Sequence, residues 1–269
     1  MPELPEVETT RRGIRDHLEG RKLQGWVVRQ PQLRWPVEVP EKLRDASLRR
    51  IRRRAKYLLF EFDEGALILH LGMSGSLRMV ETGSAHGKHD HLDLCFDSGV
   101  TLRLTDPRRF GSLHYQDDVA EQHWLLERLG VEPLEDDFDG AYLHRLSRKR
   151  RVAVKSFLMD GRVVVGVGNI YANEALFMAG IRPRIAAGRI TLARYDVLAC
   201  QVKSVLQAAI EEGGTTLRDF VGGDGRPGYF RTELKVYGRE SLPCVVCATP
   251  LTGIRTQQRA TVYCSSCQR

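Results

Sequence analysis

The sequence predicts an α+β protein in which a helix and an antiparallel β-sandwich or barrel precede a helical region and a small cysteine module. Three observations support this class. Apolar and polar residues alternate, as in strands, in much of the stretch from 20 to 116, and apolar residues recur at helical spacing between 141 and 214. The third observation is that four of the six cysteines lie in the last 26 residues. A chain of 269 residues is long enough for one large domain or two ordinary ones.

The first element is a helix in the stretch "PEVETTRRGIRDHLEG", which runs from Pro5 to Gly20. Proline is tolerated at the first position of a helix, and glycine commonly ends one. Val7, Ile14 and Leu18 fall on one face of this helix. Pro2 lies upstream of the predicted start, so the helix does not explain it.

Several strands follow. "KYLLFEF", which begins with Lys56, and "ALILHL" flank the turn-forming "DEG" and predict a hairpin. "HLDLCF" alternates, with Leu92 and Leu94 on one face and His91 and Asp93 on the other, and "VTLRLT" alternates in the same way. These strands predict a multi-stranded antiparallel sheet system, either a sandwich or a barrel.

The character of the chain changes at "GVEPLEDDFDG", residues 130–140, which is acidic, contains proline and shows no periodicity. Helices are expected over 141–160, 171–180 and 193–214. The predicted domains are therefore an N-terminal catalytic domain over 1–130, a hinge over 131–140, a helical domain over 141–238 and a cysteine module over 239–269.

Charge and composition limit the class of partner. The net charge is +7, the pI is about 9.2, and 42% of the residues are hydrophobic. The basic excess favours a polyanion, with nucleic acid first and a membrane surface second. No apolar run is long enough to cross a bilayer, and the acidic opening "MPELPEVE" is not a signal peptide. We therefore expect a cytoplasmic protein without a membrane partner.

The cysteine module has the spacing of a Cys₄ zinc site, in which each C-x-x-C supplies two thiolates. Its ligands are Cys244, Cys247, Cys264 and Cys267. Four protein ligands leave no open position, so a zinc ion here would be structural and would stabilise a module too small to fold on its own core. Disulfides or free thiols are the alternative. A hairpin between the two pairs would carry Arg255 and Arg259, while Cys95 and Cys200 are predicted to be buried apolar residues.

Several motifs together point to one family. In chain order they are "PELPEVET", "RRAKYLLF", "HLGMSGSL", "KHDHLDL", "TDPRRFG", "VVGVGNIYANEALF", "GGTTLRDF", "GRPGYF" and "QRATVYC". With them the chain resembles the formamidopyrimidine-DNA glycosylases, bacterial enzymes that excise oxidised purines, from residue 2 to residue 268. Endonuclease VIII, which acts on oxidised pyrimidines, shares the architecture but differs around the opening motif and the middle of the N-terminal domain.

The resemblance implies a bifunctional DNA glycosylase and abasic-site lyase in base excision repair. It would be a monomer that flips 8-oxoguanine or formamidopyrimidines out of damaged double-stranded DNA and cleaves the strand by β,δ-elimination. The rival from another class is a non-catalytic damage-binding protein on the same scaffold. Such a protein has no need of the two residues to which the resemblance assigns the chemistry, Pro2 and Glu3.

The resemblance makes Pro2 the nucleophile. If Met1 is removed, Pro2 is a secondary amine with a pKa of about 8, partly unprotonated at neutral pH. Its attack on the sugar C1′ gives a Schiff base that stays cationic and serves as an electron sink. Glu3 would move protons to and from the opening sugar ring, and Glu6 would help to orient the site.

The resemblance also assigns residues that hold the DNA. Met73, Arg108 and Phe110 would fill the space left by the flipped base, with Arg108 donating to the orphaned partner. The phosphate at the lesion would be held by Lys56, His70, His89 and Arg259. Because His89 and His91 share one strand face, a metal site is the alternative there.

In the second half of the chain, "VGVGNIYANEALF" resembles the first part of a helix–two-turns–helix motif. The glycines permit turns whose amides point at phosphate, and Asn169 adds a side-chain donor. Lys155 and Tyr237 match further DNA- or lesion-contacting positions. The stretch 215–230 resembles a loop that closes over an oxidised purine.

Overall fold

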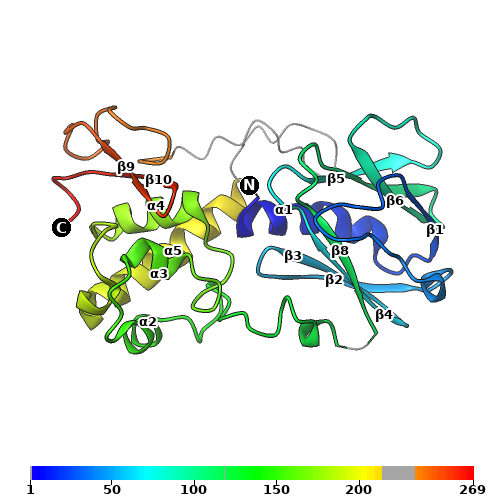
Figure 1. Cartoon of the computed structure of the whole chain (residues 1–269), viewed down its shortest axis with the longest axis horizontal. Coiled ribbons are helices and arrows are strands. Elements are labelled where there is room, and N and C mark those ends of the chain that lie inside the picture. Colours follow the sequence, from blue (N-terminus) through cyan, green and yellow to red (C-terminus); the bar gives the residue numbers. More distant parts are fainter. Residues whose placement is uncertain (1, 118, 214–233) are drawn as a thin grey trace. The chain divides into compact units, whose positions relative to one another are not determined.

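The computed structural model describes residues 2–117, 119–213 and 234–269. The chain divides into two compact units, of which the first extends to Arg128 and the second begins at Leu129 (Figure 1). The first unit contains strands together with one long helix, and the second contains helices and a two-stranded hairpin. This arrangement confirms the predicted α+β class.

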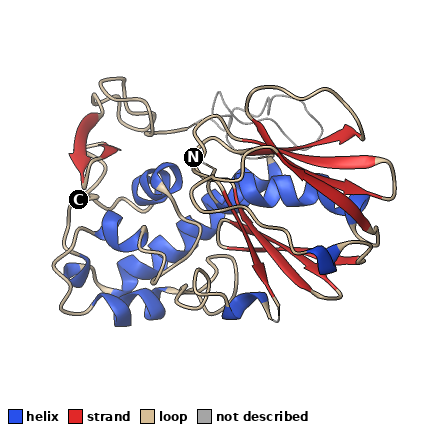
Figure 2. Ribbon diagram, turned by 45° about the vertical axis from the view of Figure 1, so that its right-hand side comes forward, coloured by secondary structure: helices blue, strands red, loops and turns tan. Residues whose placement is uncertain are grey.

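The first unit begins with α1 (Leu4–Leu18) and is built from two four-stranded antiparallel sheets (Figure 2). One sheet has the spatial order β1 (Leu23–Val28), β6 (Asp90–Phe96), β7 (Val100–Thr105), β5 (Ser76–Glu81). The other has the order β2 (Leu48–Arg54), β3 (Tyr57–Phe62), β4 (Gly65–His70), β8 (Ser112–Gln116). Two 3₁₀ turns, η1 (Glu41–Leu43) and η2 (Ala120–Gln122), lie outside the sheets. The strands form two separate sheets, so the sandwich is correct and the barrel is not.

One apolar core joins α1 to both sheets. The predicted stripe of α1 is fully buried in it together with Phe60 of β3 and Leu104 of β7. Burial of such a side chain stabilises the fold by about 1.5–3 kcal/mol. Because its apolar stripe packs on this core, α1 is fixed to the sandwich at its N-terminal end as well as along its length.

The two faces that alternate in β6 are both buried, except at Cys95, which is half-buried. Asp93, on the outer face, is 4% exposed and accepts hydrogen bonds at 2.8 Å from two nitrogens of Arg103. Arg29 adds a bond at 2.5 Å. Burial alone would raise the pKa of Asp93, but these two arginines lower it to about 2. Arg103 also donates to the carbonyl groups of Ser84 and Ala85, so a loop and an ion-pair network cover this face.

The sequence predicted that Lys56 lies in a strand, and this is wrong. β2 ends at Arg54 and β3 begins at Tyr57, so Lys56 is in the turn between them. Ala55 has a φ of 56°, a left-handed conformation that ends the strand. The lysine is therefore presented at the end of a hairpin.

The second unit contains α2 (Gly140–Ser147), α3 (Val154–Leu158), α4 (Asn169–Met178), η3 (Ala187–Arg189) and α5 (Leu192–Glu211). The continuous helix expected over 141–160 is wrong, because the chain leaves helical geometry after Ser147. Lys149 has a φ of 64°, and Ala153 forms an isolated bridge to Ala186. The main-chain pairing of 152–153 with 186–187 satisfies groups that a helix would have used.

The C-terminal hairpin consists of β9 (Thr252–Thr256) and β10 (Arg259–Tyr263). Its turn residues, Gln257 and Gln258, both have positive φ, as a tight hairpin turn requires. Asn173 of α4 accepts the amide of Val262 at 3.0 Å, which fastens the hairpin to the helix. Among the described residues, no helix is long and apolar enough to cross a membrane.

The two cysteines outside the C-terminal cysteine module were predicted to be buried, and this is wrong. Cys95 is half-buried and Cys200 is exposed on α5. Apolar residues at helical spacing predict that α5 has a buried face, but they did not show that Cys200 lies outside that face.

Candidate functional site

The N-terminal residues are held by the first turn of α1. Glu3 is the N-cap, and its amide donates to Oε2 of Glu6 at 2.8 Å. Pro2, Glu3 and Glu6 are all buried. This capping-box contact fixes the main chain directly after Pro2, so the residue predicted as nucleophile is attached to a rigid element rather than to a loose end.

α1 is in turn fastened to the sandwich by Glu8. Its carboxylate is paired with Arg11 at 2.8 Å, Arg12 at 2.9 Å and Arg53 of β2 at 3.3 Å. Burial alone would raise the pKa of Glu8, but the hydrogen bonds and charges of these arginines lower it. The pairing across to β2 keeps the start of α1 in register with the sheet.

His70 and Lys56 lie at the same end of the β3–β4 hairpin, where Tyr57 pairs with His70. The two rings of this pair are 4.8 Å apart. Burial lowers the pKa of His70 to about 4, and the positive charges of Lys56 and Arg34 contribute to that shift. His70 is therefore a neutral hydrogen-bond donor beside two cations, an arrangement that suits a phosphate group.

Met73, Arg108 and Phe110 are presented by two neighbouring loops. Met73 is 40% exposed and Phe110 is 43% exposed, so neither is a core residue. The Arg108 guanidinium lies over the Phe110 ring at 5.0 Å. Gly72 has a φ of 66°, and a Cβ there would lie 2.4 Å from the Phe110 carbonyl carbon. The absence of a side chain at Gly72 allows the two loops to touch.

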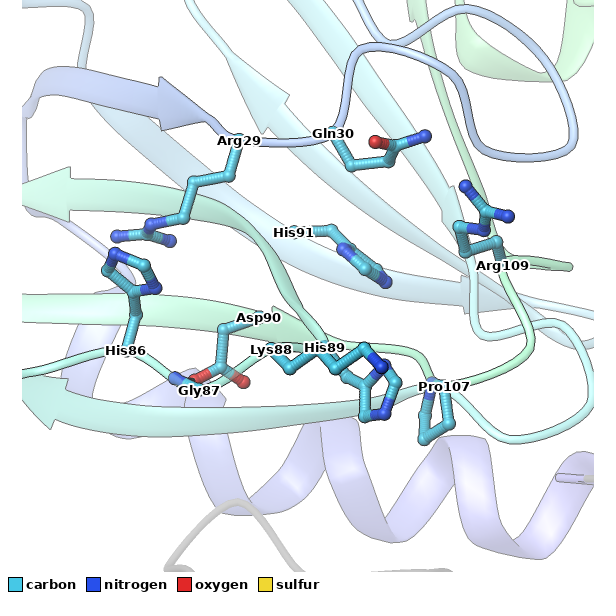
Figure 3. A pocket seen from close by; sticks show the side chains of 10 residues that line it. All are labelled: Arg29, Gln30, His86, Gly87, Lys88, His89, Asp90, His91, Pro107 and Arg109. Atoms are coloured by element: carbon cyan, nitrogen blue, oxygen red, sulfur yellow. Dashed lines mark hydrogen bonds between the residues drawn. The ribbon is translucent and has the colours of Figure 1, made fainter.

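His89 lines a basic pocket of about 480 Å³ in the first unit (Figure 3). Arg29 and Gln30 lie on one side of it, and the segment from His86 to His91 lies opposite. His91 is 7% exposed, and its Nε2 is 2.8 Å from the Asp106 carbonyl oxygen. Because that nitrogen is engaged in a hydrogen bond, and because no metal-ligand group in the described ranges includes either histidine, a metal is not supported here.

Asn169 is the first residue of α4, directly after the glycine turn that ends at Gly168. The first amides of a helix have no intrahelical acceptor and carry a partial positive charge, which favours an anion. The side-chain Oδ1 of Asn169 is buried without a hydrogen-bond partner among the described residues. This oxygen can only accept a hydrogen bond, so the Nδ2 group of Asn169 is the part that could donate to a phosphate.

Lys155, on α3, is 1% exposed. Its Nζ donates to the carbonyl oxygen of Ala260 at 2.8 Å and to Oγ1 of Thr261 at 2.7 Å. Both acceptors belong to β10, immediately after the exposed Arg259, and Lys155 and Arg259 line one pocket of about 330 Å³. The lysine thus holds the strand that presents Arg259.

Tyr237 is held through its main chain by Glu174 of α4. The Glu174 carboxylate is 4% exposed and accepts the amides of Lys235 at 2.8 Å, Val236 at 3.0 Å and Tyr237 at 2.8 Å. Three amides converging on one buried carboxylate satisfy its charge. The segment that carries Tyr237 is therefore anchored to the same helix as Asn169.

The four C-terminal cysteines form a candidate metal site. Their sulfur atoms all lie within 4.8 Å of one another, with Cys244 and Cys267 at 4.0 Å and Cys247 and Cys264 at 3.5 Å. A tetrahedral zinc ion with Zn–S bonds of about 2.3 Å requires sulfur atoms about 3.8 Å apart. All six cysteines are free, so the disulfide alternative is wrong.

Three residues that act on the predicted site residues were missed in the sequence. Arg34 stands alone in "QLRWPV", Asp106 looked like part of a turn before proline, and Glu174 lies inside an apolar helix. Of the three, only Glu174 could have been found from the sequence, because an acidic residue among apolar helix residues is usually buried with partners. The predicted closing loop, 215–230, lies outside the described residues.

Comparison with known proteins identifies relatives of both units. Residues 1–113 match the formamidopyrimidine-DNA glycosylase N-terminal domain, and residues 129–221 match the formamidopyrimidine-DNA glycosylase H2TH domain. The chain is 59% identical to a formamidopyrimidine-DNA glycosylase of Alcanivorax borkumensis and 58% identical to one of Pseudomonas putida. Both similarities cover all of this chain and all of the relative.

Solved structures of similar proteins have the same fold over nearly the whole chain. The MutM (Fpg) protein from Thermus thermophilus has a TM-score of 0.89 and 37% identity, covering 99% of this chain and 98% of that one. The Lactococcus lactis Fpg bound to DNA with an abasic site has a TM-score of 0.90 and 32% identity, covering 99% of each chain. A complex of the Lactococcus lactis protein with Fapy-dG-containing DNA is similar at a TM-score of 0.88, 32% identity and coverage of 99% and 100%.

Proposed function

Because the chain belongs to the formamidopyrimidine-DNA glycosylase family, an enzyme family that acts on damaged DNA, we propose that it excises oxidised purines by way of a Pro2 Schiff base. The substrates are 8-oxoguanine and formamidopyrimidines in duplex DNA. Strand cleavage at the resulting abasic site follows by β,δ-elimination. The protein acts as a cytoplasmic monomer in base excision repair.

The observation that carries the proposal is the position of Pro2 at the capped start of α1, beside Glu3. After removal of Met1, the Pro2 nitrogen attacks C1′ and the bond from C1′ to the base breaks. The base leaves with a proton, and Glu3 protonates the ring oxygen as the C1′–O bond opens. The product is an iminium ion joining Pro2 to the open sugar.

Elimination follows from this iminium. When a proton leaves C2′, the positive nitrogen takes up the electron pair and an enamine forms. The enamine then returns the pair to form a double bond between C2′ and C3′, the C3′–O bond breaks, and the phosphate leaves. A second elimination breaks the C5′–O bond, which leaves phosphate at both ends of the gap. The protein supplies the amine and moves the protons, so the reaction needs neither a redox partner nor a catalytic metal.

The phosphate at the lesion is held by Lys56 and His70. His70 donates as a neutral group, while Lys56 supplies charge from the turn at the end of the same hairpin. Arg34 adds a second cation on this side. A fixed phosphate places the sugar in range of the nucleophile, and such positioning lowers the barrier of the attack.

Base flipping depends on the exposed trio at the two loops. Met73 and Phe110 fill the gap in the stack, and Arg108 bonds to the base left without a partner. Their exposure and the stacking of Arg108 on Phe110 support this assignment.

The second unit binds the DNA backbone. The N-terminal amides of α4 together with Asn169 donate hydrogen bonds to a phosphate, and the C-terminal hairpin presents Arg259 to the DNA backbone. Zinc is the metal that fits the four thiolates, and it stabilises the hairpin without entering the reaction. Zinc binding and hairpin stability are thus linked.

Borohydride trapping tests the function. The chain, verified by mass to begin at Pro2, is mixed with duplexes that carry 8-oxoguanine opposite cytosine and with duplexes that carry thymine glycol. A covalent complex and strand cleavage with 8-oxoguanine are expected. Binding without trapping or cleavage would favour a damage-binding protein, and preference for thymine glycol would favour the oxidised-pyrimidine enzymes.

A further inference from the structure

Asp106, the residue directly after β7, has a fully buried side chain. Its Oδ1 accepts hydrogen bonds from the Ser74 hydroxyl at 2.7 Å and from the Arg108 amide at 3.3 Å. Its Oδ2 accepts the Gly111 amide at 2.7 Å. One carboxylate is therefore bonded to the loop of Met73 and to both ends of the loop from Arg108 to Phe110.

The main chain of Asp106 ties in a third segment. Its amide donates to the carbonyl oxygen of His89 at 2.9 Å, and its own carbonyl accepts from Nε2 of His91 at 2.8 Å. His89, His91 and Arg109 are seen around the same pocket in Figure 3. The strand end at Asp106 is thus the point at which three loops meet.

The loops need such an anchor because parts of them are strained. Arg109 has a φ of 57°, a conformation that costs about 1 kcal/mol or more for a residue other than glycine. The Arg109 amide donates to the Asp106 carbonyl at 3.2 Å, and the residue lies between two amides bonded to the Asp106 carboxylate. These bonds offset the strain and keep Arg108 and Phe110 on one side of the loop.

Ser74 links the two loops directly. Its hydroxyl oxygen donates to Asp106 and also lies 3.2 Å from the Arg108 amide, from which it accepts. Ser74 follows Met73, and Arg108 is two residues from Phe110. A shift of one loop by itself would break both contacts of Ser74 and leave a buried carboxylate short of donors, which is costly.

We propose that Asp106 is a positioning residue that holds the Met73 loop and the Arg108–Phe110 loop as one rigid unit, so that the three exposed side chains enter the duplex together. The inference rests on the proposed function, because it deepens the role of those side chains. Asp106 itself touches neither the lesion nor the reacting atoms.

The test variant is Asp106→Asn, which keeps the size of the side chain but turns one acceptor oxygen into a donor. Excision of 8-oxoguanine paired with cytosine should fall by about 10²-fold, the loss expected from a misplacement near 1 Å. Borohydride trapping on a ready-made abasic strand should change by less than about threefold, since no paired base has to be displaced. Fluorescence of 2-aminopurine placed beside an uncleavable abasic analogue should rise with the wild-type protein and stay low with the variant.

Asp93→Asn is the matched control. Asp93 is also a buried carboxylate, on the neighbouring strand β6, but its partners are Arg29 and Arg103 rather than the two loops. This variant should lower the melting temperature without changing the ratio of excision to trapping. If Asp106→Asn does not fold, the ratio of excision to trapping is measured with Ser74→Ala instead. This variant removes the bridging hydroxyl and leaves the carboxylate in place.

The proposal is overturned if excision and trapping fall in parallel, or if Asp93→Asn shows the same selective loss. If Asp106→Asn does not fold, an unchanged ratio of excision to trapping in Ser74→Ala overturns the proposal as well. A wild-type protein that neither excises 8-oxoguanine nor is trapped would instead refute the proposed function, so the two failures are distinguishable.

Discussion

His70 and Gly72 are joined by a hydrogen bond in which the Gly72 amide donates to Nδ1 of His70 at 2.9 Å. The nitrogen that accepts this bond carries no proton, so a neutral His70 has its proton on Nε2. The bond also fastens the loop of Met73 to the end of β4. His70 is therefore an oriented, uncharged donor that is structurally connected to the loop next to it.

The first prediction concerns pH. The pKa of His70 is lowered from 6.5 to about 4 in the folded protein, because burial and the charges of Lys56 and Arg34 disfavour its protonation. The unfolded chain binds a proton at this residue at higher pH than the folded chain does. The free energy of unfolding should therefore fall as the pH decreases from about 6.5 to about 4, by at most about 3 kcal/mol from this group.

Urea unfolding of the wild type and of His70→Gln at pH 7.5 and at pH 4.5 measures the effect. The wild type should lose more stability between the two values than the variant does. His114 and His123, whose pKa values are also lowered by burial, are present in both proteins and cancel in the comparison. Identical pH dependence in the two proteins would contradict the assignment.

Arg108→Ala should separate recognition from chemistry. Removing the guanidinium takes away both the donor to the orphaned base and the stacking on Phe110. Excision of 8-oxoguanine opposite cytosine should fall by about tenfold or more, while cleavage of a ready-made abasic strand should fall much less. Single-turnover rates on the two duplexes measure the ratio.

Arg49→Ala is the control for Arg108→Ala. Arg49 is an exposed arginine of β2 that pairs with Asp63 at the surface. Its removal lowers the net charge by the same amount and should leave both rates unchanged. Equal losses on both substrates in Arg108→Ala would show that Arg108 does not act at the flipping stage.

Blocking the N-terminus should abolish the chemistry and spare the binding. Acetylation of Pro2 delocalises the nitrogen lone pair into a carbonyl, so it can no longer attack C1′. Trapping and strand cleavage should be lost together, whereas binding to an abasic analogue should fall much less. The same preparation with a free Pro2 is the control, and trapping by a fully blocked chain would identify a lysine, first Lys56, as the nucleophile.

Lys155 and Arg259 should behave differently although they line one pocket. Lys155→Met removes two hydrogen bonds to β10, so it should lower the melting temperature and DNA affinity together. Arg259→Ala should lower affinity with little effect on stability, and it should reduce the slope of log affinity against log salt by about one. Calorimetry and titrations at several salt concentrations check both. A Lys155→Met protein of full stability would contradict the holding role.

Removal of the metal should uncouple the hairpin from the rest of the second unit. Cys244→Ser or Cys264→Ser removes a buried thiolate ligand, and stability and DNA binding should fall together. Metal analysis should find one zinc ion per wild-type chain and less in the variants. A folded, metal-free wild-type protein with full DNA affinity would refute a structural role for the metal.

Local patterns were sufficient for much of the fold. The apolar stripe that contains Val7, the alternation in β7 and the paired C-x-x-C motifs are each visible as residue types repeated at short spacings, although the contacts that they make are with distant segments. The helix across 141–160 failed because the break after Ser147 depends on pairing with 186–187, more than 30 residues away. Lys56 lies outside the predicted strand for a local reason, because the left-handed conformation of Ala55 makes a turn and β3 begins one residue later, at Tyr57.

By itself, the sequence determined the class of fold and the cysteine site, because each depends on residue type at a short, fixed spacing, and its motifs revealed the family. Only the tertiary structure decided what the site residues touch. It showed that Lys155 is buried against the hairpin, that His70 is held neutral and that Asp106 joins two loops about 30 residues apart in the chain. Burial and hydrogen-bond partners arise from packing between distant segments, and a single linear sequence does not display those distances.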